Sequence, residues 1–559
     1  MTTAMTAAHA LIDVLLSWGV RHVFTCPGST EAPFLDASID RPELEVCLAT
    51  HELTAVSMAD GYARFAGGVP GVAYLHTNVG LTNGLGAMYA AQLARSPVVV
   101  LNGLKASVIQ ARRGFTAIPD VGGFAAPHAK WTWQSLRSQE LASDLSRALQ
   151  LATASPPGPV WLGLPEDLMA APAEQVASPP RRSRAVSAGR PATEQVAAAA
   201  AALSQARRPL LVAGADVARE GAWDLLVALS ERLGATVVNE DRRSFERSAF
   251  PTDHPHYAGF YANRLPAVVN ADVIAFLGGR CFHEFEAGAM PGPPDQATVI
   301  HSNADPVEIG KTHGADITLT GDHRAILAEL LAAIPEHHHR DAPGRVDATA
   351  GVTISHGADT VSRGADQFED RLTVAATMDA LAAVLDASAG APVTIVADAT
   401  TSNSALFSRV RQQRASQLVT TSCGALGWGT GAALGVAVAR PGERVVAVLG
   451  DGSFQFGLQA LWVAARRRVP VTFVVVNNES YAAVAAALRR YGRRAVAAER
   501  YPGKDIAGPH LAEIAQGHGV PAERVETPAQ LTKALATAIA ADGPRMVEVM
   551  TDPADLGPS

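Results

Sequence analysis

An aspartate and an asparagine end two strand-like runs in the last third of the chain. Asp451, in the turn sequence GDGS, directly follows RVVAVLG, and Asn478 ends the run VTFVVVNN. In a right-handed β–α–β crossover both parallel strands end at one edge of the sheet, where open α/β sheets bind ligands. Carboxylate and amide oxygens suit Mg²⁺, and helix N-termini favour phosphate oxygens. The pattern therefore predicts a Mg²⁺–diphosphate site, with two unrelated turns as the alternative.

The segment between these two residues should be the crossover helix. Ser453 is expected to cap a single helix over FQFGLQALWVAARRR, whose basic end suits a helix C-terminus. Pro470 then precedes the second strand. This unit would hold Asp451 and Asn478 side by side.

Strand-like runs alternate with helical patterns along most of the 559 residues, which are too many for one core. This alternation is typical of open parallel sheets covered by helices on both faces. We expect an α/β protein with three doubly wound parallel-sheet domains. The expected ranges are an N-terminal domain over 1–172, a linker over 173–192, a central domain over 193–336, a linker over 337–371 and a C-terminal domain over 372–559.

The composition narrows the class of protein. A net charge of −8 gives no reason to expect nucleic acid or an anionic membrane as a partner. Leu11, Val14, Leu15 and Trp18 recur at helical spacing, so the N-terminus reads as an amphipathic helix, and no apolar run is long enough to span a bilayer. The four cysteines form no CxxC pair, which favours reduced thiols and a cytoplasmic location.

The spacing GDG, 24 residues from Ser453 to Val476, then NN resembles the cofactor motif of the thiamine diphosphate-dependent 2-oxo acid decarboxylase and acetolactate synthase superfamily. The resemblance implies that Mg²⁺ is bound by Asp451, the side chain of Asn478 and the main-chain oxygen of Ser480. The diphosphate and the rest of the cofactor would contact Gly450, Gly452, Ser453 and Tyr481.

Other segments resemble the same superfamily. In CLATHELTAVSMADGYAR, Glu52 matches the glutamate that hydrogen-bonds the aminopyrimidine and so promotes loss of the thiazolium C2 proton; a helix-start carboxylate is the structural alternative. In TSCGALGWGTGAALG, Leu426 matches the apolar wedge beneath the two rings, and the Gly424 carbonyl would accept from the pyrimidine amino group. Thr400 and Thr401 match positions that contact the diphosphate.

Within the superfamily the chain resembles the benzoylformate decarboxylases, through FTCPGSTEAPFLDA, AYLHTNVGLTNGLGAM and APHAKWTWQ. Ser29 and His76 fall where that group has a serine and a histidine that act on substrate. A second histidine is expected in the central domain, but Phe285 stands at the matching position and His283 lies two residues earlier.

The segment after Asn478 also departs from that group. Ala483 and Ala487 replace bulky residues and would widen the substrate pocket. The arginines that follow fit a solvated face, or contacts with an anionic or larger acceptor; they are Arg489, Arg490, Arg493 and Arg494. The run His337–His339 reads as a solvated loop rather than a metal site.

The resemblance implies thiamine diphosphate- and Mg²⁺-dependent decarboxylation of a small-molecule 2-oxo acid, with carboligation to an aldehyde as a possible second outcome. The alternatives are an acetolactate synthase-like carboligase, a lyase acting on a 2-hydroxy ketone or 2-hydroxyacyl thioester, and a non-enzymatic cofactor-binding regulatory protein. It further implies a homodimer or homotetramer whose active sites combine Glu52 of one subunit with Asp451 of another.

Overall fold

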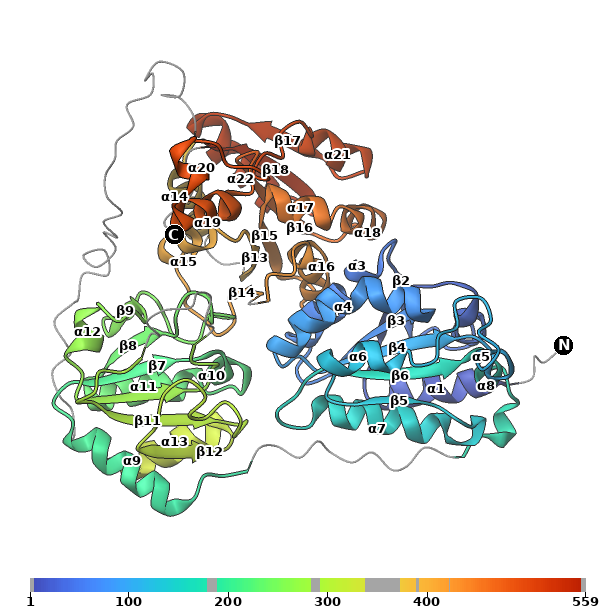
Figure 1. The fold of residues 1–559 in the computed structure, drawn as a ribbon, viewed down its shortest axis with the longest axis horizontal. Coiled ribbons are helices and arrows are strands. Elements are labelled where there is room, and N and C mark those ends of the chain that lie inside the picture. The colour runs from blue at the N-terminus through green and yellow to red at the C-terminus, as the bar shows by residue number, and fades with distance from the viewer. Residues whose placement is uncertain are drawn as a thin grey trace. The chain divides into compact units, whose positions relative to one another are not determined.

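The structure is a computed structural model that describes residues 5–177, 189–282, 292–336, 372–388, 392–421 and 423–553. His283, Phe285, the run His337–His339 and the expected linker 337–371 lie outside these residues. Three six-stranded parallel sheets, each accompanied by helices, make up the described part (Figure 1). The expected α/β class with three parallel sheets is therefore confirmed.

The chain divides into two compact units. The first comprises Met1–Val186, Arg371–Asn403 and Cys423–Ser559, and the second comprises Ser187–Asp370 and Ser404–Ser422. The N-terminal sheet and most of the C-terminal sheet belong to the first unit, and the central sheet belongs to the second.

The N-terminal sheet has the strand order β2-β1-β3-β4-β6-β5. Its strands are β1 (His22–Cys26), β2 (Glu45–Leu48), β3 (Gly71–His76), β4 (Val98–Leu104), β5 (Thr132–Gln134) and β6 (Val160–Pro165). Its helices are α1 (Ala7–Ser17), α2 (Ala32–Ser38), α3 (Glu52–Ala63), α4 (Thr77–Leu93), α5 (Ser107–Gln110), α6 (Gly122–Ala125), α7 (Leu141–Thr153) and α8 (Glu166–Met169), with short 3₁₀ turns η1 (Ser29–Glu31), η2 (Ala126–His128), η3 (Ser138–Glu140) and η4 (Ala173–Gln175).

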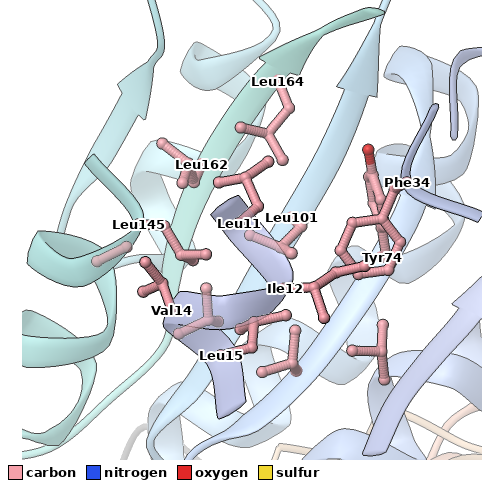
Figure 2. Packing of buried hydrophobic residues seen from close by; sticks show 14 of the residues in the cluster. Leu11, Ile12, Val14, Leu15, Phe34, Tyr74, Leu101, Leu145, Leu162 and Leu164 are labelled. Carbon is pink, nitrogen blue, oxygen red and sulfur yellow. The ribbon is translucent and has the colours of Figure 1, made fainter. Parts of the chain in front are cut away.

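The amphipathic first helix is confirmed as α1. Its apolar residues Leu11, Val14 and Leu15 are buried in one cluster with Leu101 of β4 and Leu162 of β6 (Figure 2). An apolar stripe on a helix is stable only when it is buried, so α1 packs on one face of the N-terminal sheet and covers it.

The central sheet has the order β12-β11-β10-β7-β8-β9. Its elements are α9 (Thr193–Gln205), β7 (Pro209–Ala213), α10 (Ala215–Arg219), α11 (Trp223–Leu233), β8 (Thr236–Asn239), β9 (Tyr257–Phe260), α12 (Pro266–Val269), β10 (Val273–Leu277), β11 (Thr298–Asn303), β12 (Ile317–Thr320) and α13 (His323–Ala333).

The C-terminal sheet has the order β14-β13-β15-β16-β18-β17. Its strands are β13 (Val393–Asp398), β14 (Leu418–Thr420), β15 (Arg444–Gly450), β16 (Val471–Asn477), β17 (Ala522–Val525) and β18 (Arg545–Met550). Its helices are α14 (Val374–Ala387), α15 (Asn403–Arg409), α16 (Trp428–Ala439), α17 (Asp451–Phe456), α18 (Gln459–Arg467), α19 (Ala482–Tyr491), α20 (Arg494–Ala497), α21 (Leu511–Gly517) and α22 (Pro528–Ala540).

Helices α3 and α16 pack closely within the first unit. The Trp428 indole Nε1 donates to Oδ2 of Asp60 at 2.7 Å, and both side chains are buried. A Cβ atom at Gly435 would lie 2.0 Å from the carbonyl oxygen of Met58, so only glycine permits this approach. The contact joins the helix that begins with Glu52 to the helix that follows Leu426.

All four cysteines are free thiols, as expected. Across the described residues, no helix combines the length and the apolar character needed to cross a bilayer.

Candidate functional site

The β15–α17–α18–β16 crossover brings Asp451 and Asn478 together. β15 and β16 are adjacent parallel strands, with Gly450 opposite Val476. The Ser480 backbone N–H lies 3.2 Å from Oδ2 of Asp451 and 3.1 Å from Oδ1 of Asn478, so it donates toward both oxygens. The predicted meeting of these two residues at one sheet edge is therefore observed.

The cap expected at Ser453 is wrong, and so is the single helix. Gly450 is the N-cap of α17, which begins directly at Asp451, so Ser453 already lies inside the first turn. The helix stops before Gly457, where a Cβ atom would lie 2.4 Å from the Thr430 hydroxyl, and α18 then begins. Because the chain packs closely against α16 at Gly457, the single helix that the sequence predicts is divided into α17 and α18.

Ser453 instead donates its hydroxyl to Oδ1 of Asp398 at 3.1 Å. Oδ2 of Asp398 accepts from the backbone N–H groups of Gly427 and Gly429, each at 3.0 Å. Burial raises the pKa of Asp398 to about 6, although these donors lower it. The hydrogen bonds of Asp398 thus connect the carboxyl end of β13 to the first turns of α16 and α17.

The chemistry of this edge fits a bound cation. Burial raises the pKa of Asp451 to about 6, although backbone N–H donors lower it. The shift indicates that the charged carboxylate has lost part of the stabilisation that water would give it. The buried Ser480 hydroxyl oxygen has no hydrogen-bond partner within the described part of the chain. A divalent cation would supply the missing charge stabilisation, and Asp451, Asn478 and Ser480 could hold it.

The other residues assigned to the cofactor lie around the same edge. Thr400 and Thr401 follow the carboxyl end of β13, and Thr400 has a positive φ of 33°. Gly424 is exposed with a φ of 68°, and Leu426 is half-buried just before α16. Tyr481 covers the start of α17.

That cover is close: a Cβ atom at Gly452 would lie 2.5 Å from the Tyr481 ring. Glycine is therefore required at this point of the turn if Tyr481 is to pack there.

Glu52 is the first residue of α3 and is half-buried. Its Oε2 accepts from the Asn83 side chain of α4 at 3.1 Å. The thiol of Cys26 lies beside it; burial and then the negative charge of Glu52 raise the pKa of Cys26 to about 11. This position in the first turn of a helix is also the one that the structural alternative predicts.

Ser29 and His76 lie at the carboxyl edge of the N-terminal sheet. His76 ends β3, and its Nδ1 lies 2.9 Å from Oε2 of the fully buried Glu31 and 2.8 Å from the Thr30 hydroxyl. Glu31 also accepts from the Gly28 backbone N–H at 2.6 Å. The carboxylate therefore fixes the orientation of the imidazole, while Nε2 has no hydrogen-bond partner among the described residues.

Sequence reasoning missed three polar residues here: Glu31, Asp398 and Lys105, whose Nζ lies 2.9 Å from the Ser29 hydroxyl oxygen. Glu31 stands in CPGSTE, three residues after the glycine to which it bonds, which is the spacing of a capping box and could have been noticed. The partners of Asp398 and Lys105 lie far away in the sequence, and no local pattern reveals them.

The segments that carry the two groups of candidate residues pack together in one chain: a Cβ atom at Gly86 of α4 would lie 3.7 Å from Cβ of Ala425, and one at Gly431 of α16 would lie 3.1 Å from the Thr54 carbonyl oxygen of α3. Among the residues described, no hydrogen bond or ion pair links Glu52 to Asp451 or Asn478. The arginines after Asn478 are exposed, as the solvated-face interpretation expects; the guanidinium of Arg489 lies 5.0 Å from the Tyr501 ring centroid.

Three domain models of the thiamine pyrophosphate enzymes, which use the cofactor also called thiamine diphosphate, match the chain. The N-terminal thiamine pyrophosphate-binding domain matches residues 5–122, the central domain 196–330 and the C-terminal thiamine pyrophosphate-binding domain 398–549. The chain belongs to this family of thiamine diphosphate-dependent carbon–carbon lyases and carboligases.

Relatives within the family include decarboxylases and synthases. The chain is 31% identical to a benzoylformate decarboxylase of Pseudomonas aeruginosa, over 98% of this chain and 99% of that one. It is 28% identical to a probable acetolactate synthase large subunit of Methanocaldococcus jannaschii, over 99% and 93%. Among solved structures, the 4-hydroxybenzoylformate decarboxylase of Rhodococcus jostii RHA1 superposes with a TM-score of 0.86 at 26% identity, over 99% of this chain and 100% of that one.

Proposed function

We propose that the protein decarboxylates a 2-oxo acid with thiamine diphosphate and Mg²⁺. The observation that carries this proposal is the Glu31–His76 pair at the carboxyl edge of the N-terminal sheet. A histidine whose Nδ1 is held by a buried carboxylate keeps Nε2 available for proton exchange with a substrate. Likeness to the benzoylformate decarboxylase supports the same reaction class.

Each group would have a distinct role. Asp451, the Asn478 side chain and the Ser480 carbonyl hold Mg²⁺, while the N-terminus of α17 receives the diphosphate. The bound cofactor supplies the carbon nucleophile and the electron sink. Glu52 holds the proton of the aminopyrimidine, Leu426 supports the bent cofactor, Ser29 orients the substrate, and His76 exchanges a proton with it.

An active site shared between two subunits is part of this proposal. This part of the proposal rests on the superfamily resemblance, which implies that Glu52 and Asp451 come from different chains. We propose a homodimer or a dimer of dimers, in which α3 of one subunit faces α17 of the next. We also propose the domain ranges 1–172, 193–336 and 372–559, since each contains the strands of one of the three sheets.

The first test replaces Glu52 with Gln, which preserves shape and removes the charge. Because general acid–base groups contribute about 10²- to 10⁴-fold, CO₂ release from 2-oxo acids should fall at least about a hundredfold. Calorimetry should still detect binding of thiamine diphosphate with Mg²⁺. Glu194→Gln, at an exposed position in the first turn of α9, is the matched control.

Two results would contradict the proposal. CO₂ release at the parent rate from Glu52→Gln would remove the assigned role of Glu52. Failure of the parent protein to bind thiamine diphosphate and Mg²⁺ would remove the proposed cofactor site.

Carboligation is the second candidate outcome. Ala483 and Ala487 are exposed on α19, directly after the metal-site loop, and small side chains there leave room for an acceptor. Likeness to the acetolactate synthase supports this alternative. Product analysis with an aldehyde added to the 2-oxo acid distinguishes protonation from carboligation.

A further inference from the structure

Lys105 lies beside the residues proposed to act on substrate. It directly follows β4, whose neighbour β3 ends at His76, and its Nζ lies 2.9 Å from the hydroxyl oxygen of Ser29. Ser29 is exposed and Lys105 is half-buried, so both polar groups can be reached from solvent. Nothing in the superfamily resemblance assigns this lysine a role.

The contact determines how Ser29 is used. An ammonium group can only donate, so Lys105 occupies an acceptor position of the Ser29 hydroxyl. The hydroxyl proton must then point to another acceptor. Lys105 keeps two further N–H donors, and the pair therefore presents several donors and one positive charge.

Within the part of the chain that the structure describes, no carboxylate forms an ion pair with this ammonium group. The two acids that directly follow the neighbouring strand β6 are engaged elsewhere: Glu166 accepts from the backbone N–H of Ala106 at 3.3 Å, and Asp167 accepts from that of Ser107 at 2.9 Å. Among the described residues, Lys105 forms no ion pair. A cation with free donors at a ligand-binding sheet edge is suited to an anionic ligand.

We propose that Lys105 and Ser29 together bind the carboxylate of the 2-oxo acid, and that Lys105 selects free acids over neutral carbonyl compounds. This inference rests on the proposed function, because it names the ligand of the same site. The Ser29 hydroxyl and the Lys105 ammonium each donate to the carboxylate. Ser29 directly precedes Thr30, whose hydroxyl lies 2.8 Å from Nδ1 of His76, and the imidazole would face the neighbouring carbonyl group.

The energetics predict which kinetic constant depends on Lys105. The carboxylate leaves as neutral CO₂, so its attraction to the ammonium weakens on the way to the transition state. Binding energy that does not increase in the transition state lowers KM without raising kcat. Lys105 would therefore act on substrate binding and selectivity rather than on the rate of the chemical step.

The test compares Lys105→Met with the parent in two assays. With benzoylformate or pyruvate, the KM of Lys105→Met should rise about tenfold or more, the loss expected for a charge-assisted hydrogen bond, while kcat stays within about threefold. In carboligation from benzaldehyde alone, which has no carboxylate, KM should change far less. Lys105→Arg should restore most of the selectivity, and Lys533→Met, on the exposed face of α22, is the matched control.

An unchanged KM for the 2-oxo acid would overturn the inference. An equal rise for benzaldehyde would also overturn it, since the lysine would then shape the pocket rather than bind an anion. Calorimetric binding of benzoylformate and of pyruvate to Glu52→Gln, with and without Lys105→Met, needs no turnover. It therefore tests the inference even if the parent releases no CO₂, an outcome that would contradict the proposed function alone.

Discussion

At the scale of residues, the carboxylate of Glu31 is the best-supported functional feature, although we do not expect it to contact the substrate. Glu31 is fully buried, and its two oxygens contact the Gly28 N–H, the Thr30 hydroxyl and Nδ1 of His76. A Cβ atom at Gly103 would lie 1.8 Å from Oε1 of Glu31, so the neighbouring strand leaves room only for the carboxylate. Glu31 is therefore a positioning residue for His76.

Glu31→Gln should lower kcat/KM for the 2-oxo acid by about ten- to hundredfold, as is typical when the partner that orients a functional histidine is changed. The amide can donate to Nδ1 and so favours the other tautomer of His76. The pH profile of kcat/KM should shift, whereas cofactor affinity should stay at the parent value. The effects of Glu31→Gln and His76→Ala should not add, because both act through one proton-transfer group. Additive losses would show that Glu31 acts independently of His76.

Residues also show where sequence reasoning succeeds. Asp451 and Asn478 could be paired from the sequence because the crossover that joins them spans one short, strongly patterned segment. Asp398 and Lys105 could not, since their partners are brought in by separate strands, and the same holds for the contact of Glu31 with His76. Local spacing contains no information about such contacts until the sheet order is known.

At the scale of elements, the strands that sequence reasoning located are mainly the central ones. The strand-like runs became β1, β2, β3, β4, β6, β7, β8, β10, β11, β13, β15, β16 and β18, of which only β2 is at a sheet edge. The missed strands β5, β9, β12, β14 and β17 have three or four residues each, and every one is at a sheet edge. Edge strands are short and have exposed residues, so their apolar pattern is weak.

The α3–α16 contact gives an element-scale prediction. Gly435→Ala would place a Cβ atom 2.0 Å from the Met58 carbonyl oxygen and 2.8 Å from the Tyr62 nitrogen. Overpacking of this kind costs about 1–3 kcal/mol, more than alanine gains as a helix former. The Tm should fall by several degrees, and cofactor affinity should weaken because α3 begins with Glu52 and α16 follows Leu426.

Gly517→Ala is the matched control, at the end of α21, where a new Cβ atom meets nothing within 4 Å. It should leave the Tm unchanged or raise it slightly. Equal melting temperatures for the two variants would show that the helix interface tolerates a larger residue.

At the scale of the whole molecule, the proposed function predicts that a single chain does not form a complete active site. The proposed dimer places Glu52 and Asp451 in different subunits. Closed two-fold symmetry would then create two equivalent sites, each with one contribution from either chain.

Mixing two inactive variants tests this arrangement. Glu52→Gln and Asp451→Asn chains, unfolded and refolded together, form heterodimers in which one site has both native residues. Random association should restore about a quarter of the parent activity. If each site is built within one chain, every site in the mixture has a defect and no activity returns. Each variant refolded alone is the control.

The backbone N–H of Ser480, which lies close to both Asp451 and Asn478, has a consequence for how the cofactor binds after the protein is synthesised. Since one backbone N–H already spans the Asp451 and Asn478 oxygens, the conformational entropy of these ligands is lost during folding and not when a cation arrives. We therefore expect the newly folded chain to have a preorganised ligand set at this edge, so that the cofactor binds without further folding. When a chelator removes the metal, the site should stay ordered and be able to bind the cofactor again.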